Sequence, residues 1–283
     1  MTDADRPPFG AFAPSPMQAR ARRLAHALPA NYWGRRAASL LLGPAGARAR
    51  RPFDVEIFGS QRARLHPYDN ICEKRVYATP QLWDAKERAA LARAISQSAD
   101  GVFRFVDIGA NVGLYALFAR ARCLDAGKTL RALCVEPDPE MRARLAFNAA
   151  ASGAEAELAV LPYAAAGQDG PLRFAVNVES RGMSRIDPAG GLRVAGRTVL
   201  SILREAGLER VDAMKIDIEG HEYPALEAFF AGAPDALLPS LLILEISHES
   251  EERRASALAL ERGYRELFRT RLNLVAARDQ ASG

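Results

Sequence analysis

Residues 102–113 read VFRFVDIGANVG and join a predicted strand to the start of a predicted helix. Val102–Ile108 is a short run rich in apolar, β-branched and aromatic residues, which is typical of a buried strand. Gly109 permits a tight turn close to a ligand, and Asn111 suits a left-handed or helix-capping conformation. After Gly113, apolar residues recur at helical spacing, at Leu114, Leu117, Phe118 and Ala121. The start of such a helix offers free N–H groups to a ligand.

The alternation of strand and helix continues along the chain. Further strands are predicted at Leu130–Val135, Ala159–Leu161, Ala213–Ile218, Leu241–Ile246 and Leu272–Ala276. Helices are predicted at Asp138–Ala151, Val199–Ala206, Tyr223–Phe230 and Glu249–Arg262, and Leu172–Val178 is predicted as a hairpin arm. Because alternation at this spacing forms right-handed βαβ units, the sequence predicts an α/β fold with a doubly wound, mostly parallel sheet.

The residues before this alternation are organised differently. Residues 1–16 have no periodicity and are predicted to be disordered, and a helix follows from Met17 to Leu28. Strands are predicted around Val55–Ile57 and Arg62–His66, then a helix over residues 84–98. We therefore divide the chain into a basic, partly disordered or helical N-terminal extension (1–50), accessory strands and a helix (51–99), and the α/β domain (100–283).

Positive charge is concentrated near the N-terminus. Residues 1–75 hold 13 Lys+Arg against 6 Asp+Glu, whereas the remainder holds 25 against 28. Such a basic segment suits contact with nucleic acid, an anionic membrane surface or an anionic substrate. Only four of the 38 basic residues are lysine, which indicates a general preference for arginine and favours a simple solvated arm.

Composition also bears on the location of the protein. No apolar run approaches the roughly 20 residues that a membrane span needs. Pro7, Pro8, Pro14 and Pro16 stand where a secretory signal would need an apolar stretch. The cysteines Cys72, Cys123 and Cys134 have no CxxC spacing and fit a reducing compartment. We expect a cytoplasmic protein without a transmembrane segment. Its oligomeric state stays open.

Acidic residues end the first two strands of the α/β domain. Asp107 heads the glycine-bearing turn, and Glu136-Pro137 follows the next strand. In wound sheets ligands bind beyond the carboxyl ends of the strands. A carboxylate at Asp107 suits a cationic ligand better than a phosphate, and Glu136 can accept both hydroxyls of a ribose. The dinucleotide fingerprint GxGxxG is not met, because Asn111 and Leu114 stand at its second and third glycine positions.

A second ionisable cluster follows the strand at Ala213–Ile218. Residues 215–222 read KIDIEGHE, and strand alternation predicts Lys215, Asp217 and Glu219 on one face. Five ionisable groups beside a buried strand are costly unless they line a site or form a structural ion pair. Glu245 and His248 bring a further carboxylate and imidazole to the same edge. Asp217 and Glu219 could hold a divalent ion, but the sequence shows no full ligand set, so no metal is predicted.

Four blocks together give a specific resemblance. VDIGANVGLY, VEPDPEMRARLAFN, VDAMKIDIEGHEYPALEAF and LLILEISHE resemble, in order and spacing, the FkbM family of S-adenosylmethionine-dependent methyltransferases. The resemblance implies a class I, Rossmann-like sheet of seven strands with an antiparallel last strand. It also implies cofactor contacts from residues at the strand ends: Asp107, Gly109, Ala110, Asn111 and Gly113 at the methionine end, Glu136 and Pro137 at the ribose, and Ala164 near adenine. Leu200 stands where the family often has an acidic residue.

This resemblance makes residues 100–283 an S-adenosylmethionine-binding methyltransferase domain. We expect O-methylation of a hydroxyl on a sugar, glycan or secondary metabolite. The segment 170–197, with Asn177, Arg181 and Arg185, is either an acceptor-facing lid or a solvated hairpin. The candidates for the base or acceptor anchor are Lys215, Asp217, Glu219, His221 and His248.

Two other classes of function stay open from the sequence. An NAD-dependent oxidoreductase would use a similar sheet, but the missing GxGxxG argues against it. A non-catalytic binding protein with a basic arm would bind nucleic acid or membranes in a salt-sensitive way. For the methyltransferase, no nucleic-acid partner is expected, and the basic N-terminus would allow peripheral membrane contact.

Overall fold

A seven-stranded sheet forms the centre of the computed structural model, which describes residues 7–178, 181 and 184–278. The strand order is β12-β13-β11-β10-β3-β4-β5. β13 runs antiparallel to both of its neighbours and the other pairs are parallel, as expected for an antiparallel last strand. The strands are Val102–Ile108 (β3), Thr129–Val135 (β4), Leu158–Leu161 (β5), Ala213–Ile216 (β10), Leu241–Glu245 (β11), Arg265–Arg269 (β12) and Asn273–Ala277 (β13).

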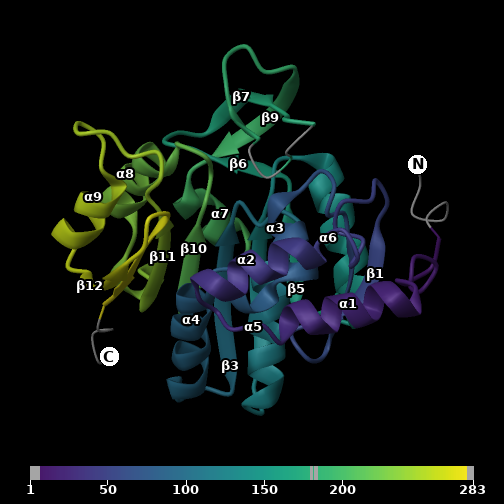
Figure 1. Cartoon of the computed structure of the whole chain (residues 1–283). Helices are drawn as coiled ribbons and strands as arrows, with labels where there is room; N and C mark the ends of the chain where they lie inside the picture. The colour runs from purple at the N-terminus through teal and green to yellow at the C-terminus, as the bar shows by residue number, and fades with distance from the viewer. Residues whose placement is uncertain (1–6, 179–180, 182–183, 279–283) are drawn as a thin grey trace.

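Helices cover both faces of this sheet, so most residues of its central strands are buried (Figure 1). On β3, Phe103 and Phe105 pack into one hydrophobic cluster and Val106 and Ile108 into the other. The first cluster includes Ala85–Gln97 (α4), Leu114–Asp125 (α5) and Pro139–Ser152 (α6), and the second includes Val199–Glu205 (α7), Glu222–Gly232 (α8) and Ala255–Glu261 (α9).

The strand order places the ligand-binding edge between β3 and β10. From β3 the chain moves outward to β4 and β5 and then crosses to β10 on the other side of β3. The loops after β3 and β10 therefore diverge and leave a crevice at their carboxyl ends. A small second sheet caps this edge (Figure 1). It is built from Tyr163–Ala165 (β6), Gly170–Ala175 (β7), Arg185–Ile186 (β8) and Leu192–Arg197 (β9).

The N-terminal part adds a hairpin and helices to the first face of the large sheet. Its elements are Pro16–His26 (α1), Tyr32–Leu41 (α2), Phe53–Ile57 (β1), Gln61–Leu65 (β2) and Ile71–Ala78 (α3), with short 3-10 turns at Pro80–Leu82 and, later in the chain, Asp235–Leu237. The two strands predicted around Val55–Ile57 and Arg62–His66 are confirmed as β1 and β2, which pair antiparallel. Among the described residues, no helix is long and apolar enough to cross a membrane.

The prediction of disorder over residues 1–16 is wrong for residues 7–16; residues 1–6 lie outside the described part of the chain. Gly10 N and Phe12 N donate hydrogen bonds to Asp54 Oδ2, at 2.8 and 3.0 Å. Arg64 pairs with Asp54 and lies over the rings of Phe12 and Phe147. The signal was missed because the partners of this segment are more than 40 residues away in sequence.

Other differences from the sequence predictions have local reasons. Helices α2 and α3 and the edge strand β12 were not predicted, and α9 begins at Ala255 rather than Glu249. β12 has no buried residue, so it lacks the alternation that marks a strand. α3 is short and is capped by Asn70, whose side chain accepts from the N–H groups of Cys72 and Glu73.

Candidate active site

A cavity of about 280 Å³ opens at the carboxyl ends of β3, β4, β10 and β11. The structure brings most of the predicted site residues to its lining: Asp107, Gly109, Ala110, Asn111, Glu136, Pro137, Ala164, Lys215, Asp217 and Glu219. Gly113, His221 and His248 do not line it. Gly113 instead permits close packing, since a Cβ there would come within 2.9 Å of Leu145 Cγ.

Asp107 is a buried carboxylate without a hydrogen-bond partner. Asp107 is only 1% exposed, and neither of its carboxylate oxygens has a hydrogen-bond partner among the described residues. Burial raises its pKa to about 6, and the charge of Asp217 adds to the shift while that of Lys215 opposes it. An unpaired buried carboxylate costs free energy unless a cationic ligand occupies the space beside it. Asp107 therefore fits the ammonium group of an amino acid.

The loop after β3 is held in place by close backbone contacts. Gly109 has a φ of +79°, and a Cβ there would lie 1.9 Å from the carbonyl oxygen of Asp217. Gly109 N and Ala110 N both donate to the carbonyl oxygen of Val135, at 2.9 and 3.0 Å. Only glycine lets the loops after β3 and β10 approach this closely. Glycine is therefore required at position 109 for two reasons: the close packing of these two loops and the positive φ of the turn.

Glu136 lies at the end of β4, next to the β3 loop. Its Oε2 accepts from Asn111 N at 2.9 Å and its Oε1 from Asp138 N at 2.8 Å. Burial raises the pKa of Glu136 to about 7, although these two N–H donors favour the charged form. A carboxylate has about four lone-pair positions, so two remain for a ligand. The geometry leaves Glu136 able to accept from a ribose diol.

Buried Lys215 and half-buried Asp217 form an ion pair in the cavity, with Nζ 2.8 Å from Oδ2. Burial favours the neutral amine, but Asp217 and Asp107 outweigh it and raise the pKa of Lys215. Lys215 Nζ also lies 5.0 Å from the centre of the Tyr115 ring, whose hydroxyl donates to Asp84 Oδ2 at 3.0 Å. The sequence allowed these charged residues either to line a site or to form a structural ion pair. Lys215 and Asp217 do both.

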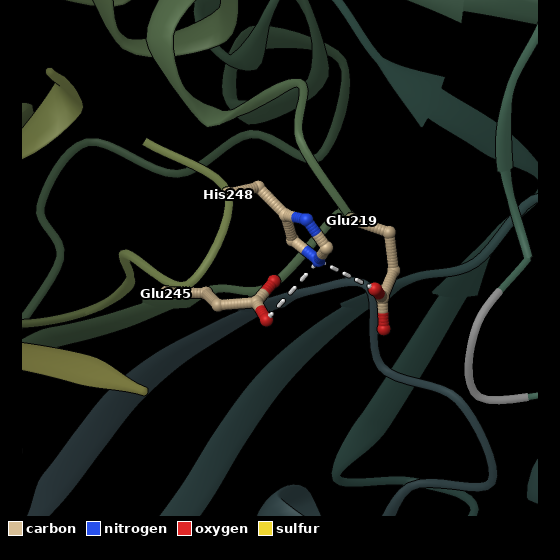
Figure 2. A group of neighbouring side chains, drawn as sticks. All are labelled: Glu219, Glu245 and His248. Carbon is tan, nitrogen blue, oxygen red and sulfur yellow. Dashed lines mark hydrogen bonds and ion pairs between the residues drawn. The ribbon is translucent and has the colours of Figure 1, made fainter. Parts of the chain in front are cut away.

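The predicted common strand face of Lys215, Asp217 and Glu219 is wrong at Glu219. β10 ends at Ile216, and Glu219 has a φ of +54° in the loop that follows. That turn carries Glu219 to the edge of the cavity, where His248 Nε2 lies 3.0 Å from its Oε2 (Figure 2). Glu245, at the end of β11, approaches the same nitrogen, with Oε1 3.8 Å from Nε2 (Figure 2).

Glu219, Glu245 and His248 also form a group whose ligand atoms lie within 4.8 Å of one another. Two carboxylates and an imidazole could hold a metal ion. The sequence prediction recognised no such set because Glu219 and Glu245 follow different strands. In the structure, burial and the charge of Asp217 raise the pKa of Glu245 to about 9.

His221 is a poorer candidate for the base than the sequence suggested. It lies at the N-terminus of α8, outside the cavity lining. Burial, helped by Arg185, lowers its pKa, and its Nδ1 has no partner among the described residues. The imidazole that reaches a cavity carboxylate is that of His248.

The segment 170–197 contributes to the cavity rather than lying free in solvent. Phe174, Arg181, Ser184 and Ile186 line it, whereas Asn177 and Arg185 do not. Arg181 Nη1 lies 3.2 Å from Asp138 Oδ2, which ties this segment to the N-terminus of α6. Leu200, at the position that is often acidic in the family, is buried against Gly232 and does not line the cavity.

Several cavity residues were missed by the sequence predictions. They come from the segment before β3 and from the loop before β13: Ile71, Cys72, Arg75, Trp83, Asp84, Arg271, Leu272 and Asn273. The residue of the sequence that could best have marked the segment before β3 is Asn70. In the structure its Nδ2 donates to Asn111 Oδ1, on the cavity lining, at 2.7 Å. An Asn before a helix is more often a cap, and Asn70 serves both roles.

Comparison with known sequences decides the family. The profile of the methyltransferase FkbM domain matches residues 107–269, which is more than half of the chain. The chain belongs to the FkbM methyltransferase family. It therefore carries a methyltransferase domain whose cofactor is S-adenosylmethionine, as the resemblance implied. No curated protein sequence matches the chain.

Matches to solved structures have low identity and low TM-scores. A methyltransferase FkbM from Methylobacillus flagellatus KT is 17% identical, with a TM-score of 0.42; the match covers 74% of this chain and 55% of that protein. Precorrin-6y C5,15-methyltransferase from Geobacter metallireducens GS-15 is 12% identical, with a TM-score of 0.42 and coverages of 68% and 89%. TrmK from M. capricolum, in complex with S-adenosyl-homocysteine, is 10% identical, with a TM-score of 0.38 and coverages of 66% and 65%. The family assignment follows from the sequence match alone.

The two carboxylates proposed to bind S-adenosylmethionine lead to a prediction about how cofactor affinity depends on pH. We propose that Asp107 binds the ammonium group and Glu136 the ribose diol. Both carboxyls would bind these groups more tightly when ionised, and burial raises their pKa to about 6 and about 7. We expect the affinity for S-adenosylhomocysteine to fall in two steps as the pH is lowered through these values. Calorimetric titrations between about pH 8 and pH 5 check this. In Glu136→Gln the upper step should disappear, and an affinity that stays constant across the range contradicts both assignments.

Proposed function

We propose that this FkbM protein methylates a hydroxyl oxygen of a sugar, a glycan or a secondary metabolite. The observation that carries the proposal is the Glu219–His248 pair at the edge of the cavity that Asp107 and Glu136 line. A hydroxyl needs a group that takes its proton as the oxygen becomes methylated, whereas an amine can enter already neutral. A carboxylate supported by an imidazole supplies such a group.

In this proposal one group of residues binds the cofactor and another accepts the proton of the hydroxyl. When bound, S-adenosylmethionine supplies an electrophilic methyl group on its sulfonium. Asp107 and Glu136 hold the two ends of the cofactor, and the Lys215–Asp217 pair fixes the wall between them. Positioning of this kind contributes about 7–11 kcal/mol to lowering a barrier. Glu219 accepts the hydroxyl proton, and His248, hydrogen-bonded to its Oε2, orients the carboxylate and stabilises the charge.

Isotope labelling in cells tests this proposal. Cells that express the wild-type chain or Asp107→Asn are fed methionine with a carbon-13 methyl group, and their metabolites and glycans are compared by mass spectrometry and NMR. We expect a labelled methoxy carbon that is present with the wild type and absent with the variant. A labelled N-methyl or C-methyl product instead would overturn O-methylation while leaving the methyltransferase assignment intact.

A further inference from the structure

Helix α2 turns its large apolar side chains outward. Trp33 and Leu40 are 74% and 79% exposed, and together with Tyr32 and Arg36 they form what we call the α2 outer face. Trp33, Arg36 and Leu40 stand at positions i, i+3 and i+7, so they share one side of the helix. Tyr32 packs edge-on against Trp33, and its hydroxyl accepts from Arg36 Nη1 at 3.0 Å.

The opposite side of α2 is made of small residues. Gly34 and Ala38, four positions apart, are its buried residues, and a Cβ on Gly34 would lie 1.9 Å from the carbonyl oxygen of Pro29. An ordinary surface helix buries its large apolar residues and exposes polar ones. α2 buries only small residues and exposes Trp33 and Leu40, so these exposed groups are not needed for packing within the chain. Contiguous exposed apolar groups of this kind mark an interaction surface.

The sequence around α2 contains basic residues and no acidic ones. Residues 7–53 contain no aspartate or glutamate, but they contain eight arginines. α1 lies beside α2 on the outside of the molecule (Figure 1) and exposes Met17 and Leu24. The exposed arginines of this region are Arg20, Arg23, Arg35, Arg36, Arg48 and Arg50.

We propose that the α2 outer face attaches the protein to the surface of an anionic phospholipid bilayer. Tyr and Trp side chains favour the boundary between headgroups and acyl chains, where Leu40 would insert and the arginines would meet lipid phosphates. Nucleic acid is the less suitable partner, because contacts with its backbone use arginines but leave Leu40 and the Trp33 edge without an apolar environment. The proposal concerns a surface outside the cavity and does not depend on the acceptor.

Tryptophan fluorescence reports directly on this contact. The chain has two tryptophans, and Trp83 is 2% exposed whereas Trp33 is on the α2 outer face. The full-length protein is titrated with vesicles of phosphatidylglycerol and phosphatidylcholine, and separately with vesicles of phosphatidylcholine alone. We expect a blue shift and quenching by brominated lipid only with the anionic vesicles, both of them lost in Trp33→Phe. Binding should weaken steeply as salt rises above about 0.1 M.

Two matched substitutions decide between the outcomes. Leu40→Asp should weaken vesicle binding about tenfold or more, whereas Leu260→Asp on α9, where the leucine is 41% exposed, should leave it unchanged. Equal binding of both variants, or no binding of the wild type to anionic vesicles, overturns the proposal. So does binding to duplex RNA or DNA that is tighter than to vesicles and insensitive to Leu40→Asp. Circular dichroism of each variant shows that the chain remains folded.

Discussion

Replacing Asp107 by asparagine is expected to weaken S-adenosylhomocysteine binding about 100-fold or more. Asp107 is the buried carboxylate whose oxygens have no partner among the described residues, so it is available to the cofactor's ammonium group. Removing one partner of a buried ion pair costs about 3–5 kcal/mol. Equilibrium dialysis with radiolabelled S-adenosylhomocysteine measures the change. An affinity within a few-fold of wild type would show that Asp107 does not bind the cofactor.

The same substitution should stabilise the protein without cofactor, and the sign follows from the pKa. Burial raises the pKa of Asp107 from 3.8 to about 6, so between these values the folded state binds more protons than the unfolded state. Stability therefore falls as the pH rises through this window, and above it the charged Asp107 costs about 2–3 kcal/mol. Urea unfolding should show Asp107→Asn to be more stable than wild type near pH 8, with the advantage shrinking toward pH 4.

Asp54 supplies the matched control for this effect. It is also a buried carboxylate, but it pairs with Arg64 and accepts from the backbone N–H groups of Gly10 and Phe12. Although burial opposes ionisation, these contacts hold the pKa of Asp54 below its usual value. Asp54→Asn should therefore destabilise the protein near pH 8. If Asp54→Asn and Asp107→Asn shift stability in the same direction, the account of Asp107 is wrong.

Replacing Glu219 by glutamine should lower turnover by about 10²–10⁴-fold, with cofactor affinity changed by less than about threefold. Glutamine keeps the size of the side chain but cannot take the acceptor's proton. Turnover is measured on the acceptor that carbon-13 labelling identifies, and cofactor affinity by equilibrium dialysis. Because general-base catalysis requires an ionised carboxylate, the residual activity of Glu219→Gln at saturating cofactor should also lose the acid limb of the pH profile.

Histidine variants separate this role from the alternatives. His248→Ala should lower turnover because it removes the hydrogen bond to Glu219, whereas His221→Ala should not, since His221 lies outside the cavity. Glu227→Gln changes an exposed carboxylate on α8 and serves as the charge control. Full turnover in Glu219→Gln would exclude Glu219 as the base. A loss of turnover in His221→Ala alone would assign the base to His221.

Much of the sheet could be predicted from the sequence because its strands are buried on both faces. Val102–Ile108 was predicted with the bounds that the structure shows, and the other core strands were found within a few residues. The edge strand β12 was missed because no residue of it is buried. Helix α2 was missed because its large apolar residues face outward, which removes the usual pattern of a packed helix.

The site was predictable where residues follow strand ends, and not where the chain folds back from far away. Asp107, Glu136 and Lys215 lie at carboxyl ends of parallel strands, and such ends meet at one edge of a sheet. Cys72, Asp84 and Arg271 reach the same cavity from segments with no comparable rule, and Asn70 contacts its lining through Asn111. Glu219 shows a further limit, since its left-handed backbone ends the alternation that a strand would have continued.

Calorimetric titration of the full-length wild-type protein with S-adenosylhomocysteine tests whether the cavity between Asp107 and Glu136 is the cofactor site. Near pH 8 we predict saturable heat, with one molecule bound per chain, and a large loss of affinity in both Asp107→Asn and Glu136→Gln. The absence of binding heat from the folded wild-type protein at two temperatures, or unchanged binding by both variants, would contradict it.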